Sequence, residues 1–499
     1  MNKRILSLAL AMAMIVLLFS GCKDNSNTDE HRLITQTTTA VIKDTGSFKL
    51  SYSQSDSLDP FKSKTLNNQV LEDLVFDSLF TMDENYESQP QIAGSYAYTD
   101  SKTLSVTIPR GTLFSNGDEV TAQSVVNSFN EAQLSPHWRN SLKAIESARE
   151  GDNNSVIFSL SYPNPNAHNL LTFAIASSKT DKNGMAVGSG RYKYSVDDGQ
   201  LKLVVNKHYP DFSPRFTKIP LVNVATEESV DNAVNIGNIS FAYRDLSSGN
   251  NVRLQCNKKL INLNNLVYIG LNNYSASIVS NANIRRAISL AIDRDTLVKS
   301  SYQGCARSAT SVFNPVSRLG KSTKVFGSAA DPVAAKQAVA QSGYPKEKLK
   351  LTLLVNKNKN RVSAAKLIKQ ELEAVGFEVT INTEKDKAYK KGVKNRNFDI
   401  YIGETAVTND MNLYSFFKKN GATAYGIDTK NSKAASAYKK YMNGKGEIGN
   451  FVIAFSEELP FIPVLYRQGM ICYSKSIRGD MQGYHGNYFS NIEDWYCNQ

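Results

Sequence analysis

Histidine and cysteine are scarce in this sequence, which limits the chemistry that it can support. The 499 residues contain five histidines and five cysteines. No two histidines stand at the spacing of helical metal ligands, and the cysteine spacings do not predict a zinc site. The sequence also lacks a Gly-x-Ser-x-Gly nucleophile elbow and a His-Glu-x-x-His motif. We therefore expect no metal, no cofactor and no enzymatic activity.

A nucleotide site is not expected either. Gly320-Lys321-Ser322 resembles the end of a phosphate-binding loop. That loop also has a first glycine five residues before the glycine that corresponds to Gly320. In this sequence the position is Pro315. Nucleotide binding is therefore not predicted.

Long apolar runs are missing after the N-terminus. A lysine and an arginine precede the apolar run 5–19, which is shorter than the roughly 20 residues that span a bilayer. Two small residues then precede Cys22, as in a lipoprotein signal, although Phe19 stands where leucine is more common. We expect a signal peptide over 1–21 and acylation of Cys22. An ordinary secretory signal is the alternative, and both place the mature chain outside the cytoplasm.

The residues after Cys22 are polar and show no sustained periodicity. Residues 22–46 are rich in Ser, Thr, Asn and Asp. Such a segment behaves as a flexible coil with a span on the order of 25–30 Å. We therefore expect a lipid-anchored tether that holds a globular monomer near the extracytoplasmic face of the cell membrane.

Positive charge exceeds negative charge but is widely spread. The chain carries 58 basic and 46 acidic residues, a net charge of +12. The densest basic segment is 385–396, in which Tyr389 is the one aromatic residue. Because nucleic-acid sites interleave basic and aromatic side chains, we interpret this segment as a solvated helix face and expect no nucleic-acid partner.

Periodicity predicts an α/β fold. In the second half, strands are expected at 349–355, 377–381 and 398–402, with an amphipathic helix over 363–375. A strand-helix-strand unit of this size implies parallel pairing through a right-handed crossover. A further helix is expected from a cap at Asn283 through Tyr302.

The first half is richer in strands. Alternating patterns predict strands at 47–52, 103–108, 156–160 and 201–205, and Thr121 is expected to cap a helix. For the cysteines, a disulfide between Cys472 and Cys497 is favoured because both lie late in the chain, and a bridge between Cys256 and Cys305 stays open.

Four segments, in order, resemble the peptide-type extracellular solute-binding proteins of family 5. They are Ser57-Leu58-Asp59-Pro60, the stretch 111–129 (GTLFSNGDEVTAQSVVNSF), the segment 188–192 (GSGRY) and the helix 283–295 (NIRRAISLAIDRD). In the third segment Arg191 replaces the proline of the family.

The resemblance implies a two-lobed α/β fold of the periplasmic-binding-protein type II class, with an extra subdomain in the first lobe. Two hinge strands would join the lobes, which would close on a solute. The expected division is lobe I over 47–82, 180–264 and 475–499, an inserted subdomain over 83–179, and lobe II over 265–474.

By position in the family, ligand contacts are expected from two segments. They contain Lys64 and Leu66, and Glu404, Thr405, Ala406, Val407 and Asp410. Peptide binders commonly have a tryptophan at the position of Glu404 and an aspartate, which pairs with the peptide's amino terminus, at the position of Val407. We therefore hypothesise that Glu404 or Asp410 receives the ammonium group; the alternative is that both are solvated loop acids.

The resemblance also implies the function. Family members are the capture subunits of ATP-binding-cassette importers, so we expect oligopeptide capture and delivery to a membrane permease. The alternatives are another small solute such as a nickel chelate, and a role as a sensor of pheromone peptides.

Overall fold

The computed structural model describes residues 48–249, 254–274, 277–418 and 429–497, together with 421, 425 and 427. These residues belong to the unit Asp44–Gln499. The predicted signal peptide, the tether and Cys22 lie outside the described residues.

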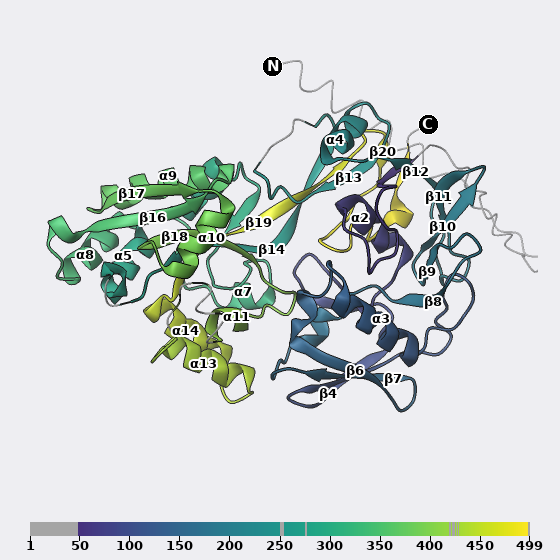
Figure 1. Ribbon diagram of the computed structural model, residues 1–499, viewed down its shortest axis with the longest axis horizontal. Coiled ribbons are helices and arrows are strands. Elements are labelled where there is room, and N and C mark those ends of the chain that lie inside the picture. The colour runs from purple at the N-terminus through teal and green to yellow at the C-terminus, as the bar shows by residue number, and fades with distance from the viewer. Residues whose placement is uncertain are drawn as a thin grey trace, which may run out of the picture. The chain divides into compact units, whose positions relative to one another are not determined.

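A seven-stranded sheet occupies the second half of the described chain (Figure 1). Its strand order is β13-β19-β14-β18-β16-β17, and β15 pairs with β19. As predicted, β16 is parallel to β17 and to β18. The strands are β13 (Phe241–Arg244), β14 (Asn257–Leu271), β15 (Ala306–Ser308), β16 (Lys350–Asn356), β17 (Glu378–Glu384), β18 (Ile400–Ala406) and β19 (Phe461–Tyr473).

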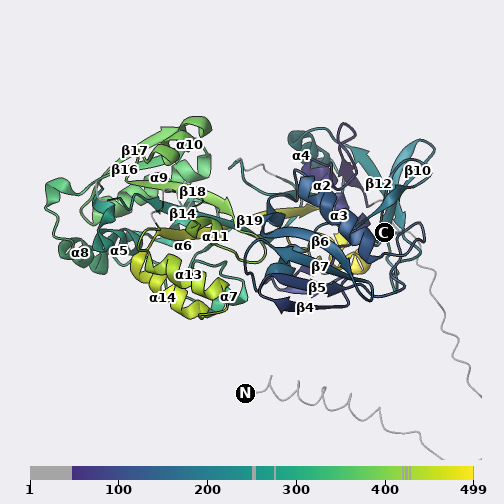
Figure 2. The ribbon, with the colours of Figure 1, turned by 60° about the horizontal axis from the view of Figure 1, so that its bottom comes forward.

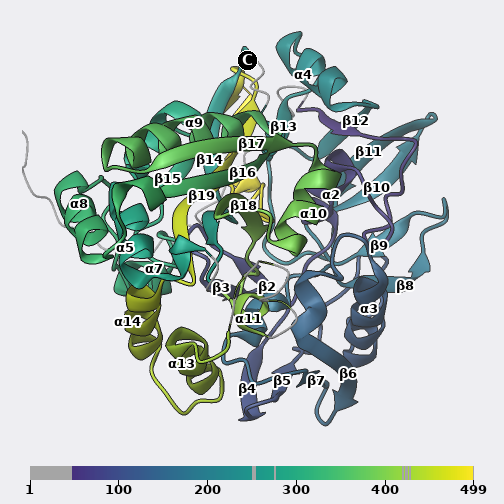
Figure 3. The same ribbon diagram turned by 60° about the vertical axis from the view of Figure 1, so that its left-hand side comes forward.

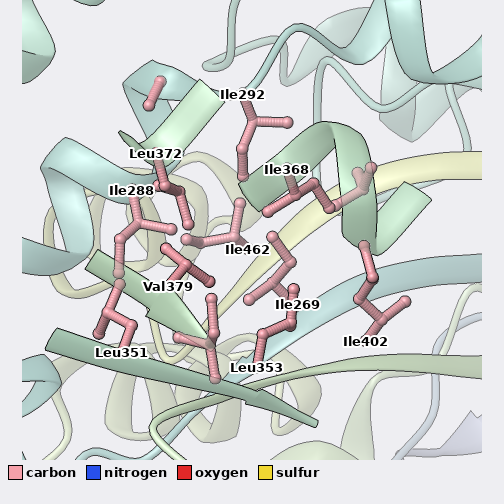
Figure 4. Close-up of a cluster of buried hydrophobic side chains, with 14 of the residues drawn as sticks. Ile269, Ile288, Ile292, Leu351, Leu353, Ile368, Leu372, Val379, Ile402 and Ile462 are labelled. Carbon is pink, nitrogen blue, oxygen red and sulfur yellow. The ribbon is translucent and has the colours of Figure 1, made fainter. Parts of the chain in front are cut away.

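Helices flank this sheet (Figure 3). One core, drawn in Figure 4, joins Ile269 of β14 and Ile462 of β19 to Ile288, Leu351 and Ile368. The helices of this half are α5 (Ala282–Ala291), α6 (Arg294–Thr296), α7 (Arg318–Ser322), α8 (Pro332–Gln341), α9 (Lys359–Ala374), α10 (Asp386–Asn395), α11 (Tyr414–Phe417), α13 (Lys433–Met442) and α14 (Ile448–Glu458).

A four-stranded sheet carries a second core. Its order is β1-β12-β11-β10, with β1 parallel to β12. Helix α2 packs against it, and the core also takes in Phe241, Phe489 and Trp495. The elements are β1 (Leu50–Tyr52), α2 (Leu66–Val75), β10 (Tyr192–Asp197), β11 (Gln200–Val205) and β12 (Lys218–Asn223). Helix α4 (Glu227–Asn235) packs instead against β13 in a small separate cluster.

An antiparallel sheet with the order β4-β5-β7-β6 has a core of its own (Figure 2). Helix α3 packs on it and begins with the predicted cap, because the Thr121 hydroxyl accepts from the backbone N–H of Ser124. These elements are β4 (Ser95–Asp100), β5 (Thr103–Thr107), α3 (Ala122–Leu134), β6 (Ile145–Gly151) and β7 (Ser155–Leu160). Three smaller pairs are β2 (Phe80–Met82) with β3 (Ser88–Pro90), β8 (Ala176–Thr180) with β9 (Ala186–Gly188), and β20 (Ile477–Arg478) with β21 (Tyr496–Cys497).

Strands β14 and β19 belong to two cores at once. Ile261 and Ile471 pack in the core of the four-stranded β1 sheet, whereas Ile269 and Ile462 pack in the core of the seven-stranded sheet. The ladder between them shifts register twice, between the pairs Asn262–Gln468 and Leu266–Tyr466 and again between Val267–Leu465 and Tyr268–Pro463. We call the first and longer of these shifts the break. Each of these two strands, which we call the crossover strands, therefore contributes residues to both cores.

Two expectations are corrected. The helix predicted from Asn283 to Tyr302 is capped by Asn281 and ends at Ala291. Ile292 is extended, and this turns the buried Arg294 inward, where its Nε donates to the Pro463 carbonyl at 3.0 Å.

The second correction concerns the cysteines. No disulfide joins them in the described part of the chain. Cys472 lies in β19 opposite Lys258, whereas Cys497 lies in β21 opposite Ile477. The favoured bridge between Cys472 and Cys497 is therefore wrong.

Arg191, which replaces the family's proline, ties the C-terminal segment to α2. Its Nη1 donates to the carbonyl of Phe489 at 2.6 Å and to that of Ser490 at 3.2 Å. Its Nη2 lies 3.9 Å from the buried carboxylate of Asp73, which also accepts from the Phe489 N–H. Burial raises the pKa of Asp73, and the Arg191 charge opposes that shift.

Substituting Arg191→Met should lower the free energy of unfolding by about 3 kcal/mol, because Asp73 would stay buried without its cation. Urea unfolding followed by circular dichroism measures this change. The exposed Arg110→Met is the matched control and should change the free energy by less than about 0.5 kcal/mol. Equal stability of the two variants would contradict this role of Arg191.

Candidate functional site

The segment predicted to contact ligand begins in β18 and continues into the loop after it. Thr405 and Ala406 are the last ladder residues of β18. The Val407 N–H donates to the Asn264 carbonyl at 2.8 Å, and the Asn264 amide donates to the Thr408 carbonyl at 3.0 Å. Asn264 lies within the break of β14. The break therefore holds the loop in place.

Glu404 lies between two arginines. Its Oε1 accepts from Arg467 Nε at 2.5 Å and from the Asn265 amide at 3.3 Å, and its Oε2 lies 3.7 Å from Arg361 Nη2. The side chain of Arg467 is 4% exposed and that of Glu404 is 13% exposed. Two cations and one anion leave this group, which we call the Glu404 cluster, with a net charge of +1. Sequence reasoning missed both arginines.

Arg361 has hydrogen-bonding capacity left over. It stands in the first turn of α9, where its N–H donates to the capping side chain of Asn358. Its Nε is buried and finds no acceptor among the residues that the structure describes. No acidic residue stands in that first turn. Because the N-terminus of a helix is itself electropositive, an anion beside Arg361 would be stabilised twice.

Val407 is buried in apolar surroundings. It is 7% exposed and packs in a cluster with Tyr86, Leu266 and Met411. The position of the family's aspartate is thus part of a core here.

Asp410 is also buried, and its carboxylate is already bound. It accepts from the Asn164 amide at 2.6 Å and from the Thr408 hydroxyl. Burial raises the pKa of Asp410, and these hydrogen bonds oppose the shift. A cavity of about 10 Å³ adjoins it, which is room for about one water molecule.

Further contacts join the same two segments of chain. Tyr162 stacks on Tyr414 with 4.1 Å between ring centroids and accepts from the Asn412 amide at 3.1 Å. Asp410 therefore helps to connect the segment around Asn164 to the loop after β18.

Lys64 and Leu66 lie elsewhere. Lys64 is exposed, and its N–H donates to Asp56 at 2.9 Å. Leu66 begins α2 and is half-buried against the core of the β1 sheet. The described hydrogen bonds and ion pairs do not join either residue to 404–410.

A larger cavity, of about 100 Å³, borders the first part of β14. Asn262 organises it, since its Oδ1 accepts from Arg307 Nε at 2.8 Å and from the Gln468 amide at 3.0 Å. The lining residues are Asp83, Glu84, Tyr86, Lys259, Leu260, Ile261, Asn262, Arg307, Gly483, Tyr484 and His485. None belongs to a motif. The available signal was the asparagines at 262, 264 and 265, which interrupt the apolar stretch that begins at Leu260.

The surroundings of His485 and His137 disfavour the charged imidazolium. Desolvation by the surrounding protein lowers the pKa of each imidazole to about 4. At His485 the charge of Asp245 opposes the shift and that of Arg467 adds to it.

The described residues contain no group of three or more His, Cys, Asp or Glu side chains placed to hold a metal ion. Within the same residues no helix has the length and apolar character needed to cross a membrane.

Comparisons with known proteins place the chain in a family. The model of the "Bacterial extracellular solute-binding proteins, family 5 Middle" matches residues 87–424. The nickel-binding protein NikA of Staphylococcus aureus is 22% identical over 81% of this chain and 85% of its own length. The glutathione-binding protein GsiB of Escherichia coli K12 is 25% identical over 58% of this chain, which spans 60% of that relative's length.

Solved structures agree on the fold. The murein tripeptide-binding protein MppA, in its unliganded open form, superposes with a TM-score of 0.72 over 91% of this chain and 98% of its own, at 20% identity. The expected periplasmic-binding-protein-like α/β fold is therefore confirmed. Solute-binding proteins of this kind bind their ligand without transforming it. The chain belongs to the bacterial extracellular solute-binding proteins of family 5.

Proposed function

We propose that this protein captures short peptides outside the cytoplasm and delivers them unaltered to the permease of an ATP-binding-cassette importer. We further propose that it is anchored to the membrane by lipid at Cys22. That part rests on the sequence pattern at 20–22 alone. Two acyl chains would be needed for stable anchoring, because a single chain binds a bilayer only weakly.

The observation that carries the peptide proposal is the positive charge of the Glu404 cluster. Glu404 compensates one of its two arginines, and the Nε of Arg361 has no acceptor. Buried donors normally have partners, so this nitrogen suits a group that a solute brings. A peptide's terminal carboxylate supplies an anion with acceptor oxygens, and arginine binds such groups strongly.

The amino terminus of the peptide is the harder end to place. Val407 offers no charge, and the carboxylates of Glu404 and Asp410 already have partners. Glu404 or Asp410 could bind an ammonium group only by giving up one of those partners. We therefore assign recognition mainly to the carboxylate end and to main-chain hydrogen bonds, which tolerate many side chains.

Capture needs a motion that the crossover strands support. Strands β14 and β19 are shared by two cores, so bending at their break would move one core relative to the other. The division into lobes is part of this proposal. Lobe I comprises 47–82, 180–264 and 475–499, the inserted subdomain 83–179, and lobe II 265–474. A ligand drives closure only through its better fit to the closed state.

A metal chelate is the second candidate, and the same charge favours it. A relative that aligns with 81% of this chain is named as nickel-binding. The organic acids and amino acids that chelate metal ions carry carboxylates, which Arg361 would also receive. A sensor of pheromone peptides would use the same site without a permease.

A binding prediction concerns the two ends of the peptide. A tripeptide library is prepared in free, N-acetylated and C-amidated forms, and binding to the purified protein is measured by titration calorimetry. Amidation should weaken binding about 10- to 100-fold, because it removes one charge-assisted interaction with Arg361. Acetylation should change affinity by less than about threefold.

The opposite pattern, in which acetylation abolishes binding and amidation does not, would show that an acid such as Glu404 or Asp410 receives the ammonium group. Binding of nickel–histidine in the absence of any peptide binding would replace the peptide proposal with the chelate.

A second binding prediction concerns Arg361 itself. Arg361→Gln removes the charge but keeps a polar side chain, and it should weaken binding of the free peptides about 10-fold or more. Binding of the amidated peptides should be nearly unchanged. Arg286→Gln, an exposed arginine on α5, is the matched control and should bind as the wild type does. Equal losses for free and amidated peptides would mean that Arg361 acts on the fold and not on the carboxylate.

A further inference from the structure

Two cysteine side chains meet at one end of the crossover strands. Cys256 stands directly before β14, and Cys472 is the last but one residue of β19. The ladder places Cys472 opposite Lys258. Cys256 lies in the bend before β14 and packs against the cluster that contains Ala242, whose ladder partner is Cys472. The two thiols interact, and each shifts the pKa of the other.

The two thiols differ in access and in acidity. Cys472 is buried, whereas Cys256 is partly exposed. The interaction with Cys472 and the charge of Lys258 lower the pKa of the Cys256 thiol, and burial opposes them. The same contact and burial raise the pKa of Cys472. Cys256 is therefore the thiol that ionises first and that an oxidant can reach.

We propose that Cys256 and Cys472 are joined by a disulfide in the mature protein. The oxidant is a protein or small-molecule disulfide of the extracytoplasmic space, where disulfides persist. The Cys256 thiolate attacks one sulfur of the oxidant and releases its other sulfur as a thiolate. The Cys472 thiolate then displaces the first sulfur from Cys256. In sum, two protein thiols lose two electrons and two protons, and the oxidant becomes two thiols.

The remaining cysteines fit this pairing less well. The Cys305 thiol points to the Gln303 carbonyl, 3.8 Å from its sulfur. Cys497 lies in the β20–β21 pair, opposite Ile477. The sequence alone favoured Cys497 as the partner of Cys472, because the two are near each other along the chain. In the fold, Cys256 is the cysteine that interacts with Cys472.

The bond would clasp the two crossover strands at one end. It would close a loop that contains everything from β14 to β19 and would restrict the unfolded chain accordingly. The break between Asn262 and Leu266 lies farther along the strands, so it would keep its freedom. Bending would then be confined to the break. This consequence holds whatever solute the protein binds.

Thiol trapping of the full-length wild-type protein tests the bond directly. Cells that express it with its own N-terminus are treated with N-ethylmaleimide, and the protein is digested without reductant and analysed by mass spectrometry. We expect a peptide pair linked through Cys256 and Cys472, and a maleimide on Cys305. Maleimide on both Cys256 and Cys472, or a link from either to another cysteine, would overturn the proposal.

Thermal unfolding with and without a phosphine reductant provides the second readout. Reduction should lower the melting temperature of the wild type, and of the matched control Cys305→Ser, by about 5 °C. The double variant Cys256→Ser/Cys472→Ser should melt at the temperature of the reduced wild type and should not respond to the reductant. A wild type that is insensitive to the reductant would contradict the bond.

Discussion

Arg467 is a buried cation at the point where β13 and β18 end and β14 breaks. It lies in β19 beside the break of β14, and its Nη1 donates to the Asp245 carbonyl, just after β13, at 2.6 Å. Its Nε binds Glu404 at the end of β18. A guanidinium that is 4% exposed is stable only with such partners. Arg467 therefore holds the C-terminal ends of β13 and β18 in place relative to β14 and β19.

This arrangement explains why the site is positively charged. Glu404 is needed to compensate Arg467, so it has little capacity left for Arg361 at 3.7 Å. Val407, at the position where the sequence resemblance implies an anchoring aspartate, packs in a core. The candidate site thus combines a cation at the N-terminus of α9 with carboxylates that already have partners, and it stands on strands that two cores share.

Local patterns predicted much of the fold. The parallel strands around α9, the cap at Thr121 and the α/β class follow from periodicity and capping, and the structure has them. The failures are long-range. Nothing near Asn283 shows that Arg294 must turn toward Pro463, and the helix therefore ends earlier than expected. The partners of Glu404 and of Cys472 also come from distant segments, so spacing along the chain could not identify them.

The central claim is that the solute's anionic group is held by Arg361 beside the Glu404 cluster. A crystal structure of the protein purified with its natural solute tests it most directly. An anionic group of that solute should lie within hydrogen-bond distance of the Arg361 Nε, with Glu404 still paired to Arg467. A solute that sits against other residues, or one whose cationic group displaces Arg467 from Glu404, would contradict it.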